Sequence, residues 1–239
     1  MYISLFIGCA IVLDIYCYTL YGHLYVDVSF DGQWCQWKAY LFYVSGCGFF
    51  YSYLLQAIYR LCRITLFRKP ALQTFRLYVC GIVLQWLLSF VQVIPVLLLG
   101  TFEYLPYDYH CQIAIHNVRG LLIGLALVHT IPISLTTMCY AYTMFYIRKV
   151  SASIKTARQL ATDQRDFLVL KRIFIVLTTL IASGMPAFSI GLYFQFTGHL
   201  PYWSTQFQWL SATFTMLIVS IILIFVSPNM PKIRMYSTQ

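Results

Sequence analysis

The chain has 239 residues, of which 60% are hydrophobic, 18% aromatic and only 10% charged. A soluble domain carries roughly 25% charged residues, so the composition excludes a soluble globular protein. The formal net charge is +9, but the basic residues stand at the ends of apolar runs, as in the cytoplasmic loops of membrane proteins. No nucleic-acid-binding module is found, and we expect a lipid bilayer and no nucleic acid among the partners.

Six long runs of the sequence are almost free of charge. The backbone inside a bilayer must satisfy its own hydrogen bonds, so each run forms a helix or part of a closed barrel. The runs lack the alternation of a barrel strand, which leaves an all-α membrane protein. We predict one transmembrane domain, 1–239, with helices over about 1–25, 36–66, 74–100, 118–149, 166–197 and 202–227 and a short tail, 228–239.

The basic residues also predict the orientation of the helices. Most of the 16 lysines and arginines flank the second and fourth connections or follow the last helix. Only Lys38 and Arg119 lie on the other side. Cytoplasmic loops carry the excess of lysine and arginine, so we expect a multi-pass plasma-membrane protein with a cytoplasmic C-terminus. With six helices, Met1 would lie on the same side.

Two of the eight cysteines fall on the side predicted to be extracellular. Cys35 lies at the outer start of the second helix and Cys111 in the outer loop before the fourth. Disulfides persist in that oxidising compartment, and a bridge would pin the loop to the helix. The alternative is two free thiols in an aromatic-rich surface.

Several residues recur at spacings that resemble one family. An arginine stands 25 residues after the cysteine of the second helix, a tyrosine follows the proline of the fourth run by eight residues, and an acid precedes the proline of the fifth run by 20. In this order the pattern resembles the rhodopsin-like (class A) family of G-protein-coupled receptors, in an invertebrate-type member. The residues that carry the resemblance are Cys35, Arg60, Trp86, Pro132, Tyr140, Asp166 and Pro186.

The resemblance implies a seven-transmembrane receptor bundle, of which six helices are present in this chain. The family has an outer N-terminus, so we expect the chain to lack the family's first helix. The resemblance assigns Arg60, Tyr140 and Asp166 to G-protein coupling and switching. It assigns Trp86, Pro132 and Pro186 to helix packing and kinks.

Three departures from the family pattern affect the switch. Tyr59 replaces the acid that normally precedes the arginine, so Asp166 is the remaining candidate partner of Arg60. Gly184 replaces the tryptophan two residues before the proline of the sixth family helix, and the last helix lacks an Asn-Pro-x-x-Tyr motif. With one acid instead of two holding the arginine, we expect raised basal activity.

The resemblance also narrows the ligand class. Phe42 stands where amine receptors carry an aspartate, and residues 202–227 contain no lysine to hold retinal, which disfavours a biogenic amine and an opsin. The tyrosine-rich outer loop, 101–118, suits a peptide. Asp14 fits either a sodium site or the pocket, and at 18% aromatics most aromatic candidates equally fit a packing role. The pocket candidates are Asp14, Phe42, Tyr43, His129, Phe188 and Tyr193.

The sequence therefore predicts a receptor that couples an extracellular ligand to a cytoplasmic heterotrimeric G protein. No nucleophile–base set, metal cluster or phosphate loop is present in the sequence, so we expect neither an enzyme nor a metal or cofactor. A six-helix transporter or channel subunit is the alternative, although no internal repeat of the kind that many transporters contain is found. A receptor fragment that does not signal is a further alternative.

Overall fold

The computed structural model describes residues 2–25, 29–65, 74–151, 175, 178–179, 181–182 and 184–226. The chain divides into two compact units. The first comprises Met1–Ala152 with Ile190–Pro201, and the second comprises Ser153–Ser189 with Tyr202–Gln239.

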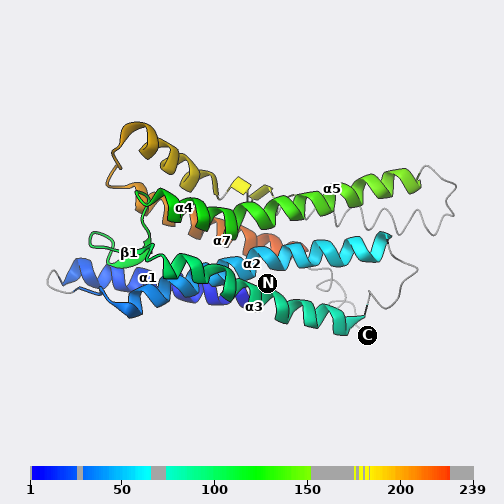
Figure 1. The fold of residues 1–239 in the computed structure, drawn as a ribbon, viewed down its shortest axis with the longest axis horizontal. Coiled ribbons are helices and arrows are strands. Elements are labelled where there is room, and N and C mark those ends of the chain that lie inside the picture. The colour runs from blue at the N-terminus through cyan, green and yellow to red at the C-terminus, as the bar shows by residue number, and fades with distance from the viewer. Residues whose placement is uncertain are drawn as a thin grey trace, which may run out of the picture. The chain divides into compact units, whose positions relative to one another are not determined.

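Long helices make up most of the described residues (Figure 1). Five of the helices in this part of the chain are long and apolar enough to cross a membrane, which confirms the predicted all-α membrane fold class. Residues 184–197, which have no label in Figure 1, are helical as well. The helices labelled in Figure 1 are α1 (Tyr2–Leu24), α2 (Gln33–Thr65), α3 (Phe75–Leu98), α4 (Val118–Leu125), α5 (Ile131–Ser151) and α7 (Ser204–Val226). A short π-helical turn, η2 (Ala126–Thr130), lies between α4 and α5.

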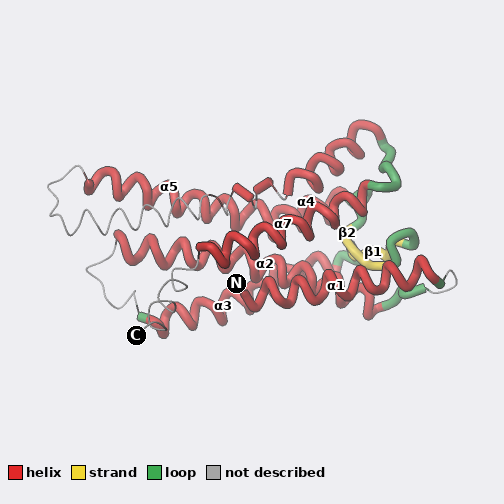
Figure 2. The backbone as a smooth tube through the Cα atoms, turned by 180° about the vertical axis from the view of Figure 1, so that it is seen from behind, coloured by secondary structure: helices red, strands yellow, loops and turns green. Residues whose placement is uncertain are grey.

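One hairpin, which the apolar pattern of the sequence does not predict, interrupts the helices (Figure 2). Strands β1 (Phe102–Leu105) and β2 (His110–Ile113) pair antiparallel, with Phe102 opposite Ile113 and Leu105 opposite His110. All four residues of β2 are buried. The hairpin therefore packs into the helical unit as part of its core.

Helix α2 is the centre of the first unit and contacts α1, α3 and α5. Its buried face is built largely from small side chains, among them Ala39, Cys47 and Ala57. Small residues let neighbouring helices approach closely inside a membrane. The ring of Trp86 on α3 uses this space and reaches the backbone of α2 at Gly48.

A buried glutamine links α2 and α3 through polar contacts. The Gln85 Nε2 group donates hydrogen bonds to the Gly48 carbonyl oxygen at 2.6 Å and to Ser52 Oγ at 2.9 Å. The Tyr40 hydroxyl adds a bond to the Phe90 carbonyl oxygen at 2.9 Å. Such bonds between membrane helices average about 0.6 kcal/mol each and reach about 1.7 kcal/mol.

Replacing Gln85 with alanine is expected to lower the free energy of unfolding by about 2 kcal/mol. The change removes both bonds to α2 and leaves a cavity between two packed helices. Chemical denaturation of the purified protein in detergent would measure the loss. Gln36→Ala, at an exposed position of α2, is the control and should cost less than about 0.5 kcal/mol. Equal stabilities of the two variants would contradict the role given to Gln85.

The predicted single helix over 118–149 contains a π turn, η2, between α4 and α5. The N–H of Ile131 bonds to the carbonyl oxygen of Ala126, five residues back. Pro132 follows at once and has no N–H to donate to the preceding turn. A break in the α-helical hydrogen-bond pattern at this proline is consistent with a wider turn directly before it.

Candidate functional site

A disulfide joins Cys35 at the start of α2 to Cys111 in β2. The two Cα atoms lie 5.4 Å apart, within the usual range for a disulfide, and both residues are buried. This confirms the predicted bridge. Below, the end of the first unit that carries the hairpin is called the hairpin end.

Helix α1 holds the turn of the hairpin. Thr19 Oγ1 donates a 2.7 Å hydrogen bond to the carbonyl oxygen of Asp108. The ring of Tyr109 lies directly on Gly22, where a β-carbon would overlap it. Tyr109 itself has a φ of 55°, a left-handed conformation that is uncommon for a residue other than glycine. The hairpin is thus fixed at β2 by the disulfide and at its turn by α1.

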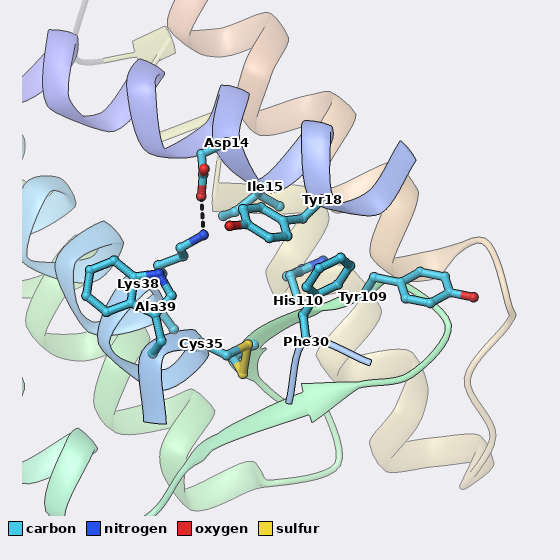
Figure 3. Close-up of a pocket in the computed structure, with 11 residues that line it drawn as sticks. Asp14, Ile15, Tyr18, Phe30, Cys35, Lys38, Ala39, Tyr109 and His110 are labelled. Atoms are coloured by element: carbon cyan, nitrogen blue, oxygen red, sulfur yellow. Dashed lines mark ion pairs between the residues drawn. A yellow bond between two sulfur atoms is a disulfide. The ribbon is translucent and has the colours of Figure 1, made fainter. Parts of the chain in front are cut away.

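These contacts border an open pocket at the hairpin end with a volume of about 120 Å³. Its walls come from α1, from the start of α2 with the residues before it, and from the hairpin (Figure 3). Most of the walls are aromatic or apolar. The lining residues are Asp14, Ile15, Tyr18, Phe30, Trp34, Cys35, Lys38, Ala39, Tyr109, His110 and Cys111.

An ion pair lies across this pocket. Lys38 Nζ of α2 is 2.7 Å from Asp14 Oδ2 of α1, and the same nitrogen lies 3.5 Å from the centroid of the Tyr18 ring. The Lys38 side chain is 20% exposed and that of Asp14 44%. An isolated acid within an apolar membrane helix is costly, so the lysine offsets the charge of Asp14. Asp14 lines the same pocket as Cys35. This position favours a role of Asp14 in the pocket over a sodium site, and that role stays a prediction.

Of the six predicted pocket residues, Asp14 is the one that lines the pocket of Figure 3. Phe42 and Tyr43 lie further along α2, with the Tyr43 ring 5.4 Å from that of Phe102. His129 lies in η2, and its ring is 5.3 Å from that of Phe50. The roles given to these residues stay predictions.

The two remaining pocket candidates lie on the helical residues 184–197. Both Phe188 and Tyr193 are exposed. Phe188 belongs to the second unit and Tyr193 to the first. Pro186 lies on the same stretch and is half-buried.

The far end of α2 carries Arg60. The Arg60 guanidinium lies near enough to the hydroxyl groups of Tyr78 on α3 and Tyr140 on α5 to interact electrostatically with both. The Tyr140 side chain is buried, and its hydroxyl has no hydrogen-bond partner among the described residues. Arg60 is half-buried on α2 and Tyr140 is buried on α5, and the coupling role that the family resemblance implies for them stays a prediction. Asp166, the predicted partner of Arg60, lies outside the described residues.

The sequence pattern identifies Lys38 only as a charge on the outer side and includes it in no predicted site. A signal for its role is present in the sequence. Lys38 stands three residues, close to one helical turn, after Cys35, and Asp14 is the lone acid of the preceding apolar run. A lone acid in one apolar helix favours pairing with a base on a neighbouring helix.

No family model matches the chain. The chicken (Gallus gallus) melatonin receptor type 1C is 26% identical over 208 residues, which cover 83% of this chain and 59% of that protein. The chain is thus distantly similar to melatonin receptors. The type 1A receptor of the chicken is 27% identical over 66% of this chain and 45% of its own length. The type 1C receptor of Xenopus laevis is 27% identical over 66% of this chain and 38% of its own length.

These melatonin receptors are class A G-protein-coupled receptors. The fold class and the Cys35–Cys111 bridge agree with a membrane receptor of that type. The matched region spans between 38% and 59% of the length of the three melatonin receptors. The chain therefore spans less than two thirds of the length of each of these relatives.

Proposed function

We propose that the chain is a rhodopsin-like receptor that couples an extracellular ligand to a cytoplasmic heterotrimeric G protein. The observation that carries the proposal is the arrangement of α2 in a homologue of melatonin receptors. The disulfide lies at one end of this helix and Arg60 25 residues further on. At about 1.5 Å per residue, the two are about 37 Å apart along the axis, enough to cross the roughly 30 Å core of a bilayer.

The coupling mechanism that we propose centres on Arg60. In the resting receptor its guanidinium is held beside Tyr140 and Tyr78, with Asp166 as its acidic partner. When the helices part at this end, the guanidinium changes neighbours and the opened cavity admits a helix of the G protein. A single acidic partner holds a membrane-buried arginine less firmly than two would, which gives a raised basal activity.

Melatonin is the first ligand to test, because the relatives are named as its receptors. Ligand binding at the hairpin end would alter the packing of α1 and the hairpin on α2. Since α2 is one continuous helix, a shift at that end reaches Arg60 through a rigid element. A peptide ligand, which the tyrosine-rich outer loop suits, is the alternative class.

The test measures guanine-nucleotide exchange by the full chain reconstituted in lipid nanodiscs. Purified heterotrimers of each Gα class are added, with and without melatonin, and empty nanodiscs are the control. We expect exchange above the control on at least one heterotrimer, even without ligand. The disulfide is verified first, so that the sample tested is folded.

Parallel measurements on the same preparation separate the alternatives. Ion flux through liposomes that contain the chain would be expected of a channel or transporter subunit and not of a receptor. Flux without nucleotide exchange would overturn the proposal in favour of that class. A folded chain with neither activity on any heterotrimer would be a non-signalling receptor fragment, which also contradicts the proposal.

A further inference from the structure

The pocket at the hairpin end offers two opposite charges side by side. The Lys38 ammonium has three N–H donors, and one of them meets Asp14 Oδ2. The Asp14 carboxylate has about four acceptor sites, and its side chain is nearly half exposed. Each partner can therefore bind a further group while the pair stays intact.

Such a pair selects for a ligand that carries both a carboxylate and an N–H donor. A carboxylate alone is attracted by Lys38 and repelled by Asp14, because the two charges are 2.7 Å apart. A cation alone is attracted by Asp14 and repelled by Lys38. An N–H donor next to the carboxylate offsets the repulsion by binding Asp14, and charge-assisted bonds of this kind are the strong ones.

The rest of the pocket suits an aromatic ring. Tyr18, Phe30, Trp34 and Tyr109 line it, and the rings of Tyr18 and Phe30 meet edge to face at 4.6 Å. Aromatic rings pack favourably in offset and edge-to-face geometries. The volume of about 120 Å³ is well below the roughly 300–1,000 Å³ of sites for drug-sized ligands, so the pocket takes one residue-sized group.

We propose that this pocket binds an α-carboxylate flanked by an N–H donor and an aromatic side chain. Lys38 binds the carboxylate, Asp14 accepts from the N–H group, and the aromatic walls hold the ring. A free aromatic amino acid and the C-terminal residue of a peptide both present this chemistry. The proposal rests on the proposed receptor function for its signalling consequence, whereas binding itself is measured without a G protein.

The competing interpretation is that the ion pair only ties α1 to α2. Both charges would then be satisfied by each other and by the Tyr18 ring, and the pocket would have no preference for an acid. The two interpretations predict different ligand selectivity. An ion pair that only links α1 to α2 affects the stability of the protein and gives no preference for an acid.

The experiment compares probes that differ in one group. Binding of N-acetyl-L-tryptophan, N-acetyl-L-tryptophanamide and L-tryptophan to the full chain in nanodiscs is measured by equilibrium binding, with no G protein present. We expect the N-acetylated acid to bind at least about tenfold more tightly than its amide, the effect of one charge-assisted hydrogen bond. Lys38→Met should abolish this preference. Arg119→Met, which removes an exposed basic residue on α4, is the matched control and should keep it.

The probes also identify the source of the ligand chemistry. Tighter binding of L-tryptophan than of its N-acetyl derivative indicates a free amino acid, and Asp14→Asn should then lower that ratio. The reverse order indicates a peptide C-terminus. Equal binding of N-acetyl-L-tryptophan and its amide overturns the proposal, and so does the absence of binding by both N-acetyl-L-tryptophan and L-tryptophan. Either result favours an ion pair that only links α1 to α2.

The wild-type comparison decides the question even if Lys38→Met fails to fold. Lys38→Arg, which keeps the charge, then serves as the second variant and should retain the preference for the acid. Nucleotide exchange does not enter these measurements, so a failure of binding and a failure of receptor signalling are distinguishable.

Discussion

Replacing Cys111 with serine is expected to lower the free energy of unfolding of the chain by about 4 kcal/mol. The bridge to Cys35 spans a sequence separation of 76 residues, and closing a loop of that length in the unfolded chain gives a stabilisation of this size in the chain-entropy model. The variant should also lose a wall of the pocket, because Cys111 and its neighbour His110 line it. Denaturation under non-reducing conditions measures the first effect, and binding of N-acetyl-L-tryptophan the second.

Two further variants make this result specific to the bridge. Cys80→Ser changes an exposed free cysteine of α3 and should leave stability within about 0.5 kcal/mol of the wild type. The double variant Cys35→Ser/Cys111→Ser should be no less stable than the single one, because either change removes the same bond. A Cys111→Ser protein as stable as Cys80→Ser would show that the hairpin is held by its other contacts alone.

Replacing Arg60 with alanine is expected to reduce nucleotide exchange on the responsive heterotrimer by at least about tenfold. The guanidinium is the group that we propose to change neighbours during coupling, and the loss of one charge-assisted contact is enough for a change of this size. Binding of N-acetyl-L-tryptophan at the hairpin end should change little, because Arg60 lies at the other end of α2. Exchange in nanodiscs and ligand binding are measured on the same preparation.

Arg63→Ala is the matched control for this prediction. Arg63 lies one helical turn further along α2 and is exposed, so its long side chain can reach the membrane surface. Its removal should leave exchange near the wild-type rate. If Arg63→Ala reduced exchange and Arg60→Ala did not, the switch role of Arg60 would be wrong.

The helices could be predicted from the sequence because the constraint that produces them is strong. An apolar run in a bilayer has no water to satisfy its backbone, so length and the absence of charge suffice. The bridge between Cys35 and Cys111 followed from compartment chemistry. Arg60 and Tyr140 could be chosen because their spacings from Cys35 and Pro132 match those of the rhodopsin-like family.

The remaining features depend on contacts that the sequence pattern does not specify. The turn of the hairpin lacks the Asn-Gly or Asp-Gly signature of short hairpins and instead places Tyr109 in a left-handed conformation. The position of Tyr109 is held by its contact with Gly22, far away in the sequence. Lys38 could not be assigned to Asp14 by periodicity either, because the pair joins two different helices.

The π turn escaped prediction for another reason. Residues 118–147 form one long apolar span, so hydrophobic periodicity contains little information about which side of the helix faces inward. Only the tertiary contacts on either side of η2 distinguish the faces of α4 and α5.

The π turn η2 also sets the angle around the helix axis between side chains on α4 and side chains on α5. Gly120 and Gly124 of α4 face the hairpin segment at Thr101 and Ile113, and Thr136 of α5 is buried in the bundle. On an uninterrupted helix Thr136 would stand about 160° round the axis from Gly120, whereas the extra residue of a π turn brings this to about 60°. One inserted residue thus lets a single helical span present Gly120 and Gly124 to the hairpin segment and Thr136 to the bundle interior.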